Sequence, residues 1–135
     1  MPYTVGDVVA ERTIHLTRES LVRYAGASGD FNPIHYRDDV AAAVGLPGVL
    51  AHGMLTMGLA SSVVVAALPG TARLIDYGVR FTKPVIVDPD SGADVEVAAK
   101  VGAMDDEAVR IDLTVRHADT TVLVKAQLRV AADSL

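Results

Sequence analysis

Three polar residues within six positions, Asp30, Asn32 and His35, are the part of this chain best suited to acid–base chemistry. They stand in the stretch Asp-Phe-Asn-Pro-Ile-His, where Pro33 keeps Asn32 out of the helical backbone region. Such a loop can aim a carboxylate and an imidazole at one point, as a general acid and base require. The same residues also suit a structural turn, since Asp and Asn side chains often bond nearby backbone. On the residues alone both interpretations stay open.

The chain lacks the residues that several other kinds of catalytic site require. The chain has no cysteine, so thiolate nucleophiles, disulfides and cysteine metal sites are excluded. Ser28 follows Gly26, but Asp30 stands where a nucleophile elbow needs glycine. His35 and His52 lack the i, i+4 spacing of a zinc-protease pair, and no third ligand is evident. There is no glycine-rich nucleotide loop, so we expect neither a metal nor a cofactor.

The stretch Gly53–Leu68 is apolar on nearly all sides and predicts the central helix of the fold. It ends at Pro69-Gly70 and is too short for a membrane span. A helix apolar on every face has to be wrapped by the rest of the chain. Free backbone N–H groups and the positive end of the helix dipole lie at Gly53, where they can hold a ligand oxygen. We therefore expect chemistry at the start of this helix.

The remaining sequence predicts short helices followed by strands. Thr17 is a suitable N-cap for a helix that Gly26 and Gly29 are expected to break, and Arg37–Val44 predicts a second, brief helix. From Thr71 onward the hydrophobic period is two, which is typical of strands. The expected strands are Val8–Leu16, Thr71–Val87, Asp94–Met104, Glu107–His117 and Thr120–Ala131. The last two show inward-facing series, Val109, Ile111, Leu113 and Val115, then Val122, Val124, Ala126, Leu128 and Val130.

One long antiparallel sheet curled around one buried helix is an α+β hot-dog arrangement, and 135 residues suffice for a single such domain, 1–135. Open sheet edges predict pairing with a second copy or a paralogue. The net charge of −5 argues against nucleic acid or an anionic membrane as the main partner. The amino terminus has no basic and apolar regions typical of a signal peptide, so we expect a cytoplasmic protein.

Three segments, Tyr24–His35, Ala51–Met54 and Val79–Val85, resemble the MaoC-like (R)-specific enoyl hydratases, and the first is similar to their hydratase 2 motif. Within that family the chain looks most like the catalytic subunit of the actinobacterial (3R)-hydroxyacyl-carrier-protein dehydratases. The resemblance implies a hot-dog dimer that hydrates trans-2-enoyl thioesters or dehydrates (3R)-hydroxyacyl thioesters in fatty-acid metabolism.

Roles for five residues follow from the resemblance. The family's catalytic aspartate and histidine correspond to Asp30 and His35, and its motif asparagine to Asn32. Its backbone donor to the thioester carbonyl corresponds to Gly53, and a serine that braces the aspartate to Ser61. A serine in an apolar helix more often bonds the carbonyl four residues earlier, so both interpretations of Ser61 stay open.

Five further residues are candidates for substrate binding. Tyr24 belongs to the motif, Met54 and Met57 could line an acyl channel, and Arg80 and Lys83 could meet phosphates of coenzyme A or an acidic carrier protein. Methionine in a core helix is more often plain packing, and charges on a strand are usually just solvated. We expect His52 to orient the entrance of the central helix. The family's loop after the Val79–Val85 segment often contains Gly-Asp, but here it reads Val87-Asp88-Pro89-Asp90-Ser91-Gly92.

Two other functions are compatible with these residues. A hot-dog thioesterase would release free thiol from an acyl thioester. A non-catalytic subunit would bind the acyl chain while its partner does the chemistry, although such a subunit has no need of the Asp30/His35 pair. The protein could also be the catalytic half of a heterodimer with a hot-dog paralogue, or a homodimer.

Overall fold

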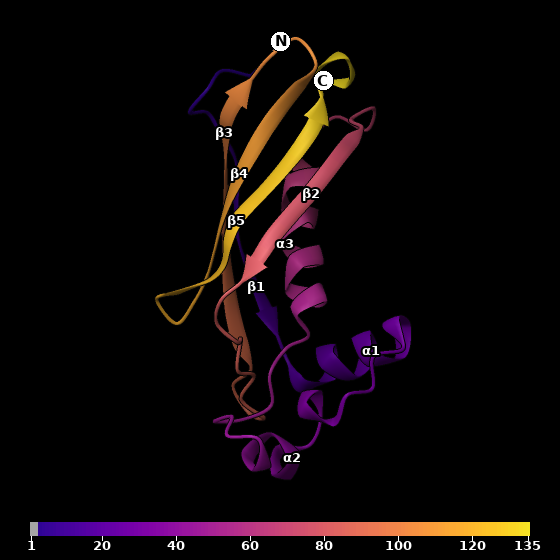
Figure 1. Ribbon diagram of the computed structural model, residues 1–135, viewed down its shortest axis with the longest axis vertical. Coiled ribbons are helices and arrows are strands. Elements are labelled where there is room, and N and C mark those ends of the chain that lie inside the picture. The colour runs from indigo at the N-terminus through magenta and orange to yellow at the C-terminus, as the bar shows by residue number, and fades with distance from the viewer. Residues whose placement is uncertain (1–2) are drawn as a thin grey trace.

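A five-stranded antiparallel sheet forms the body of the computed structural model, which describes residues 3–135 (Figure 1). The strands lie in the order β1-β3-β4-β5-β2. Their bounds are β1 Val8–Leu16, β2 Leu74–Phe81, β3 Ala93–Met104, β4 Ala108–His117 and β5 Thr120–Ala131. The predicted α+β hot-dog arrangement is confirmed. Met1 and Pro2 of the predicted domain 1–135 lie outside the described residues.

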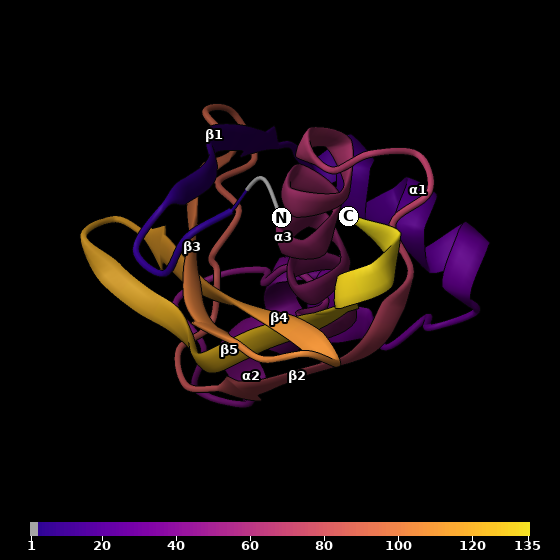
Figure 2. The same ribbon diagram turned by 90° about the horizontal axis from the view of Figure 1, so that it is seen from above.

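The long helix α3 (Gly53–Ala67) lies in the concave face of the sheet, as seen from above in Figure 2. Thr56, Ala60, Val63 and Val64 are its buried residues. Tyr77 of β2 donates its hydroxyl hydrogen to the Met57 carbonyl at 2.7 Å and so ties the sheet to the helix. Burial raises the pKa of Tyr77 to about 12, which keeps this hydroxyl a donor at neutral pH.

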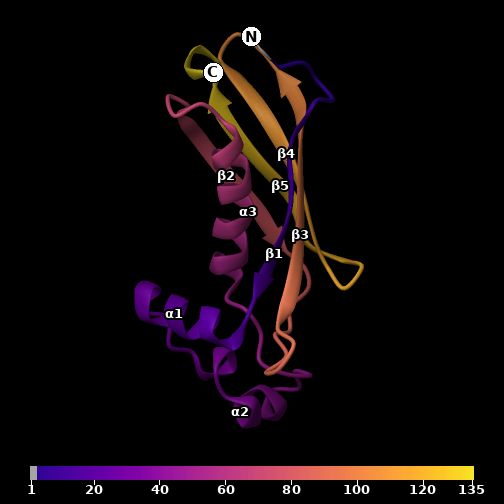
Figure 3. The same cartoon turned by 180° about the vertical axis from the view of Figure 1, so that it is seen from behind.

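The expectation that the chain wraps α3 on every side is wrong. Met54 and Val65 are 60% and 49% exposed, and Figure 3 shows α3 uncovered on the side away from the sheet. The two edge strands β1 and β2 do not meet around the helix, because the sheet curls without closing. An apolar stripe of α3 is therefore left open to solvent or to another chain. Among residues 3–135, no helix combines the length and apolar character needed to cross a membrane.

The strand periodicity is confirmed in β4 and fails at one point in β5. Val109, Ile111, Leu113 and Val115 are all buried, as predicted. In β5, Leu123 is buried and Val124 only partly so, because the register shifts opposite β4 and Lys125 adopts a positive φ of 49°. This bulge interrupts the alternation, so that the neighbours Val122 and Leu123 are both buried. The predicted strand Thr71–Val87 is also too long, since only Leu74–Phe81 pairs with β5.

Two short helices lie together at one end of the sheet, at the bottom of Figure 1. Helix α1 (Arg18–Ser28) starts after Thr17, which forms a capping box with Ser20, and ends at Gly29 with φ 77°. Gly26 does not break the helix as expected, since one internal glycine costs only about 1 kcal/mol. Helix α2 (Asp38–Ala43) falls within the predicted range.

Candidate active site

The loop that follows α1 is held by three hydrogen bonds between side chains and nearby backbone. The Asp30 N–H donates to Ser28 Oγ at 3.1 Å, and the Asn32 N–H donates to Asp30 Oδ1 at 3.1 Å. Asn32 Oδ1 then accepts the Ile34 N–H at 3.3 Å and caps the single 3₁₀ turn η1 (Pro33–His35). These bonds leave Asp30 Oδ2 free. Asn32 therefore shapes the loop that presents the Asp30 carboxylate.

His35 and Asp30 face each other, with 3.9 Å between His35 Nε2 and Asp30 Oδ2. His35 Nδ1 lies 2.7 Å from the Leu50 carbonyl oxygen. A carbonyl oxygen only accepts, so Nδ1 carries the hydrogen, and the neutral ring has its lone pair on Nε2, toward Asp30. The 3.9 Å gap is too long for a direct hydrogen bond, whereas one water oxygen about 2.8 Å from each atom fits beside both. The side chain of His35 is 8% exposed and that of Asp30 51%.

His52, which immediately precedes α3, lies behind this pair. Its ring stacks on that of His35 with 3.8 Å between centroids and 22° between planes, and Tyr24 meets it edge-on at 4.8 Å. His52 Nε2 donates to the Asp30 backbone carbonyl at 3.1 Å. Its Nδ1 is buried without a hydrogen-bond partner in the described chain. Burial lowers the pKa of His52, so its neutral form is favoured.

Asp30, His35 and His52 together offer three potential ligand atoms within 4.8 Å of one another, as a metal site would. A zinc ion needs two imidazole lone pairs that converge on it at about 2.0–2.1 Å. Nearly parallel stacked rings hold their lone pairs side by side, because each lone pair lies in the plane of its ring. The arrangement of these three residues does not fit a metal ion.

A cavity of about 250 Å³ opens at the start of α3. Gly53 and Thr56 line it on the helix side, and Phe81 and Leu123 on the sheet side. No side chain in the part of the chain that the structure describes caps α3. Because Gly53 is the first residue of α3 after the N-cap His52, its N–H has no partner within the helix.

The Phe81 ring approaches Gly53 so closely that any side chain at position 53 would displace the ring or the backbone. A Cβ atom on Gly53 would lie 2.9 Å from Phe81 Cε1, which is too close for a van der Waals contact. The backbone at the start of α3 therefore lies directly against the Phe81 ring. A backbone N–H at a cavity wall of this kind is a fixed donor for an oxygen that gains negative charge.

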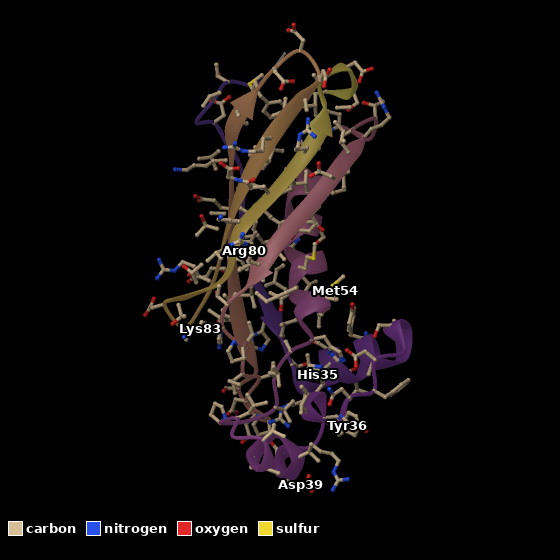
Figure 4. The ribbon with its side chains drawn as sticks, in the orientation of Figure 1. His35, Tyr36, Asp39, Met54, Arg80 and Lys83 are labelled. Carbon is tan, nitrogen blue, oxygen red and sulfur yellow. The ribbon has the colours of Figure 1, made fainter. Side chains whose placement is uncertain are left out.

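Several predicted site residues lie elsewhere. Ser61 Oγ donates to the Gly58 carbonyl of its own helix at 2.9 Å, so the expected brace to Asp30 is not formed. Met54 lies on the outer side of α3 (Figure 4), and Met57 does not border the cavity either. The expected acyl channel is lined instead by residues whose positions depend on how β2 and β5 pack on α3.

The two predicted basic residues lie on different sides of the sheet edge. Lys83 borders the cavity, whereas Arg80 is exposed and precedes Phe81, whose ring faces the cavity. Successive residues of a strand point to opposite faces, so Arg80 belongs to the outer face of the sheet. Tyr24 packs on His52 and borders a separate shallow groove with Leu55. Tyr24 thus supports the site from behind.

Phe81, Thr56 and Leu123 were missed as site residues. The position of Phe81 within the Val79–Val85 segment, as an aromatic residue at a strand end, was an available signal for it. Thr56, three residues after Gly53, was a second. The sequence contains no signal for Leu123. It turns inward because of the bulge at Lys125, and the hydrophobic alternation does not reveal that bulge.

The model of the MaoC like domain matches residues 3–122, which is most of the chain. This chain belongs to the MaoC-like family. It is 38% identical over 79 residues to the 3-hydroxyacyl-thioester dehydratase X of Mycobacterium tuberculosis, a match that covers 58% of this chain and 27% of that protein. It is 29% identical over 118 residues to the (R)-specific enoyl-CoA hydratase of Rhodospirillum rubrum, covering 83% and 82% of the two chains.

A solved MaoC-like dehydratase superposes on this chain with a TM-score of 0.87 and 34% identity, over 96% of this chain and 40% of that one. Members of this family therefore differ in length. The chain spans about a quarter of the mycobacterial relative and most of the Rhodospirillum rubrum hydratase.

Proposed function

We propose that this protein is an (R)-specific hydro-lyase that adds water to trans-2-enoyl thioesters or removes it from (3R)-hydroxyacyl thioesters. The observation that carries the proposal is the pair formed by His35 Nε2 and Asp30 Oδ2, 3.9 Å apart and both free to hold one water. The hydratase and dehydratase activities named for the relatives in Rhodospirillum rubrum and Mycobacterium tuberculosis support the same reaction.

The free N–H of Gly53 supplies the electrostatic part of the mechanism. Attack of water on C3 of an enoyl thioester moves negative charge onto the thioester carbonyl oxygen. A donor that is already in place needs no reorganisation as that charge develops, and it lies at the positive end of the α3 dipole. Hydration leaves the substrate neither oxidised nor reduced overall, so the reaction requires no redox cofactor.

Asp30 and His35 supply the proton transfers. Water held between them adds its oxygen to C3, the pair takes up the proton that leaves the water, and the pair returns a proton to C2 on the same face. Dehydration uses the same groups in the opposite sense. His35 Nε2 can accept this proton because the Leu50 carbonyl keeps the ring hydrogen on Nδ1. Acid and base are not assigned separately, because the two groups act on one water.

The cavity that begins at Gly53 is the proposed site for the acyl group. Its lining is mainly apolar, and its volume of about 250 Å³ lies just below the usual range of roughly 300–1,000 Å³ for ligand pockets, which favours a short acyl chain. Lys83 at its edge offers an exposed ammonium to the phosphates of coenzyme A or of a carrier protein.

A second hot-dog domain is the proposed partner, bound along β2. This strand pairs only with β5 in the described sheet, and Leu74, Ile75 and Phe81 are exposed along it. The open side of α3 offers further exposed apolar residues, Met54 and Val65. The mass of the purified protein in solution tests the proposal: the chain alone has 14.2 kDa, and a pair has twice that mass. Co-purification with a related hot-dog chain would identify a heterodimer instead.

Loss of enoyl absorbance from crotonyl-coenzyme A tests the reaction, with free thiol measured in parallel. The matched variant is Asp30→Asn, which keeps an oxygen acceptor for the Asn32 N–H and removes the carboxylate. We expect this variant to lose activity by about 10²–10⁴-fold without a change in melting temperature. Asp39→Asn, which alters an exposed carboxylate on α2 (Figure 4), is the control that retains activity.

Each other outcome points to a different function. Thiol release without hydration would make the protein a thioesterase. Full activity of Asp30→Asn would contradict the proposed roles of the pair. Absence of turnover with both coenzyme A and carrier-protein substrates would favour the acyl-binding subunit.

A further inference from the structure

We propose that His52 is a positioning residue that holds both members of the Asp30/His35 pair through two separate contacts. The inference deepens the proposed function and rests on it for the meaning of the pair. His52 does not face the proposed water. It acts through the backbone of Asp30 and the ring of His35.

The first contact fixes the backbone of Asp30. His52 Nε2 donates to the Asp30 carbonyl at 3.1 Å. The N–H and Oδ1 of the same residue are already bonded, to Ser28 and to the Asn32 N–H. Only Oδ2, the atom that faces His35, then stays free for chemistry. Without His52, the Asp30 carbonyl would lose its hydrogen bond to a buried side chain.

The second contact fixes the ring of His35. That ring is held at its edge by the Leu50 carbonyl and on its face by the His52 ring at 3.8 Å. A single hydrogen bond at Nδ1 leaves the ring free to rock about that bond, whereas a stacked neighbour prevents it. The two contacts together define the direction of the Nε2 lone pair. That direction decides whether His35 and Asp30 can share one water.

His52 is itself held firmly enough for this role. It is 1% exposed, its backbone starts α3, and Tyr24 of α1 closes the remaining side of its ring. The titratable groups that face it are Tyr24, His35 and Asp30. Its Nδ1 has no partner among residues 3–135, and burial lowers the pKa of the ring. A neutral His52 does not place a positive charge beside His35.

Two substitutions separate the contacts. His52→Gln keeps an N–H donor near the position of Nε2 and removes the stacked ring. His52→Phe keeps the ring and removes the donor. We expect each variant to lower kcat roughly tenfold or more while KM changes less than about threefold, because the pair is misaligned while the cavity is intact. His15→Gln, which changes an exposed histidine paired with Asp94, is the control that leaves kcat unchanged.

A ¹H–¹⁵N spectrum of the imidazole groups gives a readout that does not depend on activity. In the wild-type protein we expect His52 to carry its hydrogen on Nε2 and His35 on Nδ1, and in both variants we expect the His35 signals to shift or broaden. A wild-type His52 with its hydrogen on Nδ1 would overturn the proposal even if neither variant folds, since it could not donate to Asp30. Folded variants with unchanged kcat and unchanged His35 signals would also overturn it.

If the wild-type protein has no hydratase activity, the proposed function fails while the spectrum still decides the role of His52.

Discussion

The sheet body and the loop end of this molecule are stabilised in different ways. In the body, β3, β4 and β5 bury aliphatic side chains in long series, and each is one of many that fill the core. At the loop end, buried His35 and His52 and exposed Asp30 are placed by a few hydrogen bonds and by contacts between rings. Loss of one aliphatic contact weakens the whole fold, whereas loss of one polar contact misplaces one catalytic atom. Stability and proposed activity therefore depend on different residues.

The two regions meet at the start of α3. Buried residues of α3 pack on the sheet, and His52 just before it contacts Asp30 and His35. Gly53 belongs to both regions, since its backbone borders the cavity and lies against Phe81 of β2. Substitutions in the body, at this junction and at the end of α1 should therefore change stability and activity in three different ways.

The largest effect on stability is expected for Leu128→Ala in the body. Leu128 is fully buried on β5, so the change removes apolar contacts and leaves a void, at a cost of about 2–5 kcal/mol in the free energy of unfolding. Denaturant unfolding measures this loss. The folded fraction should retain the wild-type kcat, and Gln127→Ala, at the exposed neighbouring position, should unfold like the wild type. A fall in kcat of the folded Leu128→Ala protein would contradict the separation of the two regions.

A smaller effect, mainly on activity, is expected for Gly53→Ala at the junction. The new methyl group would lie 2.9 Å from Phe81, so the ring or the Gly53 backbone has to move. A displacement of this size near the donor N–H should lower kcat/KM by about tenfold to a hundredfold. Stability should change less, because Phe81 is half exposed and can move outward.

The double variant Gly53→Ala with Phe81→Leu checks the cause of this effect. The shorter side chain relieves the contact, so part of the lost kcat/KM should return. A double variant as impaired as Gly53→Ala alone would show that the clash with Phe81 is not the reason.

The smallest effect is expected from two glycines, one inside α1 and one at its C-terminal cap, that differ in backbone conformation. Gly26 is helical with open space around it, so Gly26→Ala should stabilise the protein by about 0.5–1 kcal/mol. Gly29 has φ 77°, so Gly29→Ala should destabilise it by roughly 1–2 kcal/mol. Thermal unfolding of both variants measures the contrast. Equal effects would mean that the end of α1 adapts freely, and the loop after it would then not be rigid.

Much of the fold was predictable because its patterns are local. The bounds of β1 and β5 and the N-cap at Thr17 agree with the expectations from hydrophobic period and capping residues. The two positions where the expectation fails also have a physical explanation. Gly26 lies within a helix that tolerates it, and the bulge at Lys125 turns Leu123 inward although the alternation predicts the opposite.

The site was predictable in part. Asp30 and His35 lie five positions apart on one loop, so their meeting depends on local backbone, and the structure places them face to face. Ser61 and Met54 depend on how α3 is oriented against the rest of the chain. Ser61 does not form the brace that the resemblance implies, and Met54 does not line the acyl channel for which it was a candidate.

By itself, the sequence determined most of the elements and the α+β class, because these follow from spacing along the chain, and it brought Asp30 and His35 onto one loop, where the family resemblance selected them as a pair. Only the tertiary structure decided which side of α3 is covered, that Phe81 and Leu123 border the cavity, and that His52 contacts both members of the pair. Asp30 and His52 are 22 positions apart, and their contact exists only because the start of α3 lies at the end of the sheet where α1 packs. Contacts of this kind depend on how whole elements pack, and no spacing within a single segment encodes them.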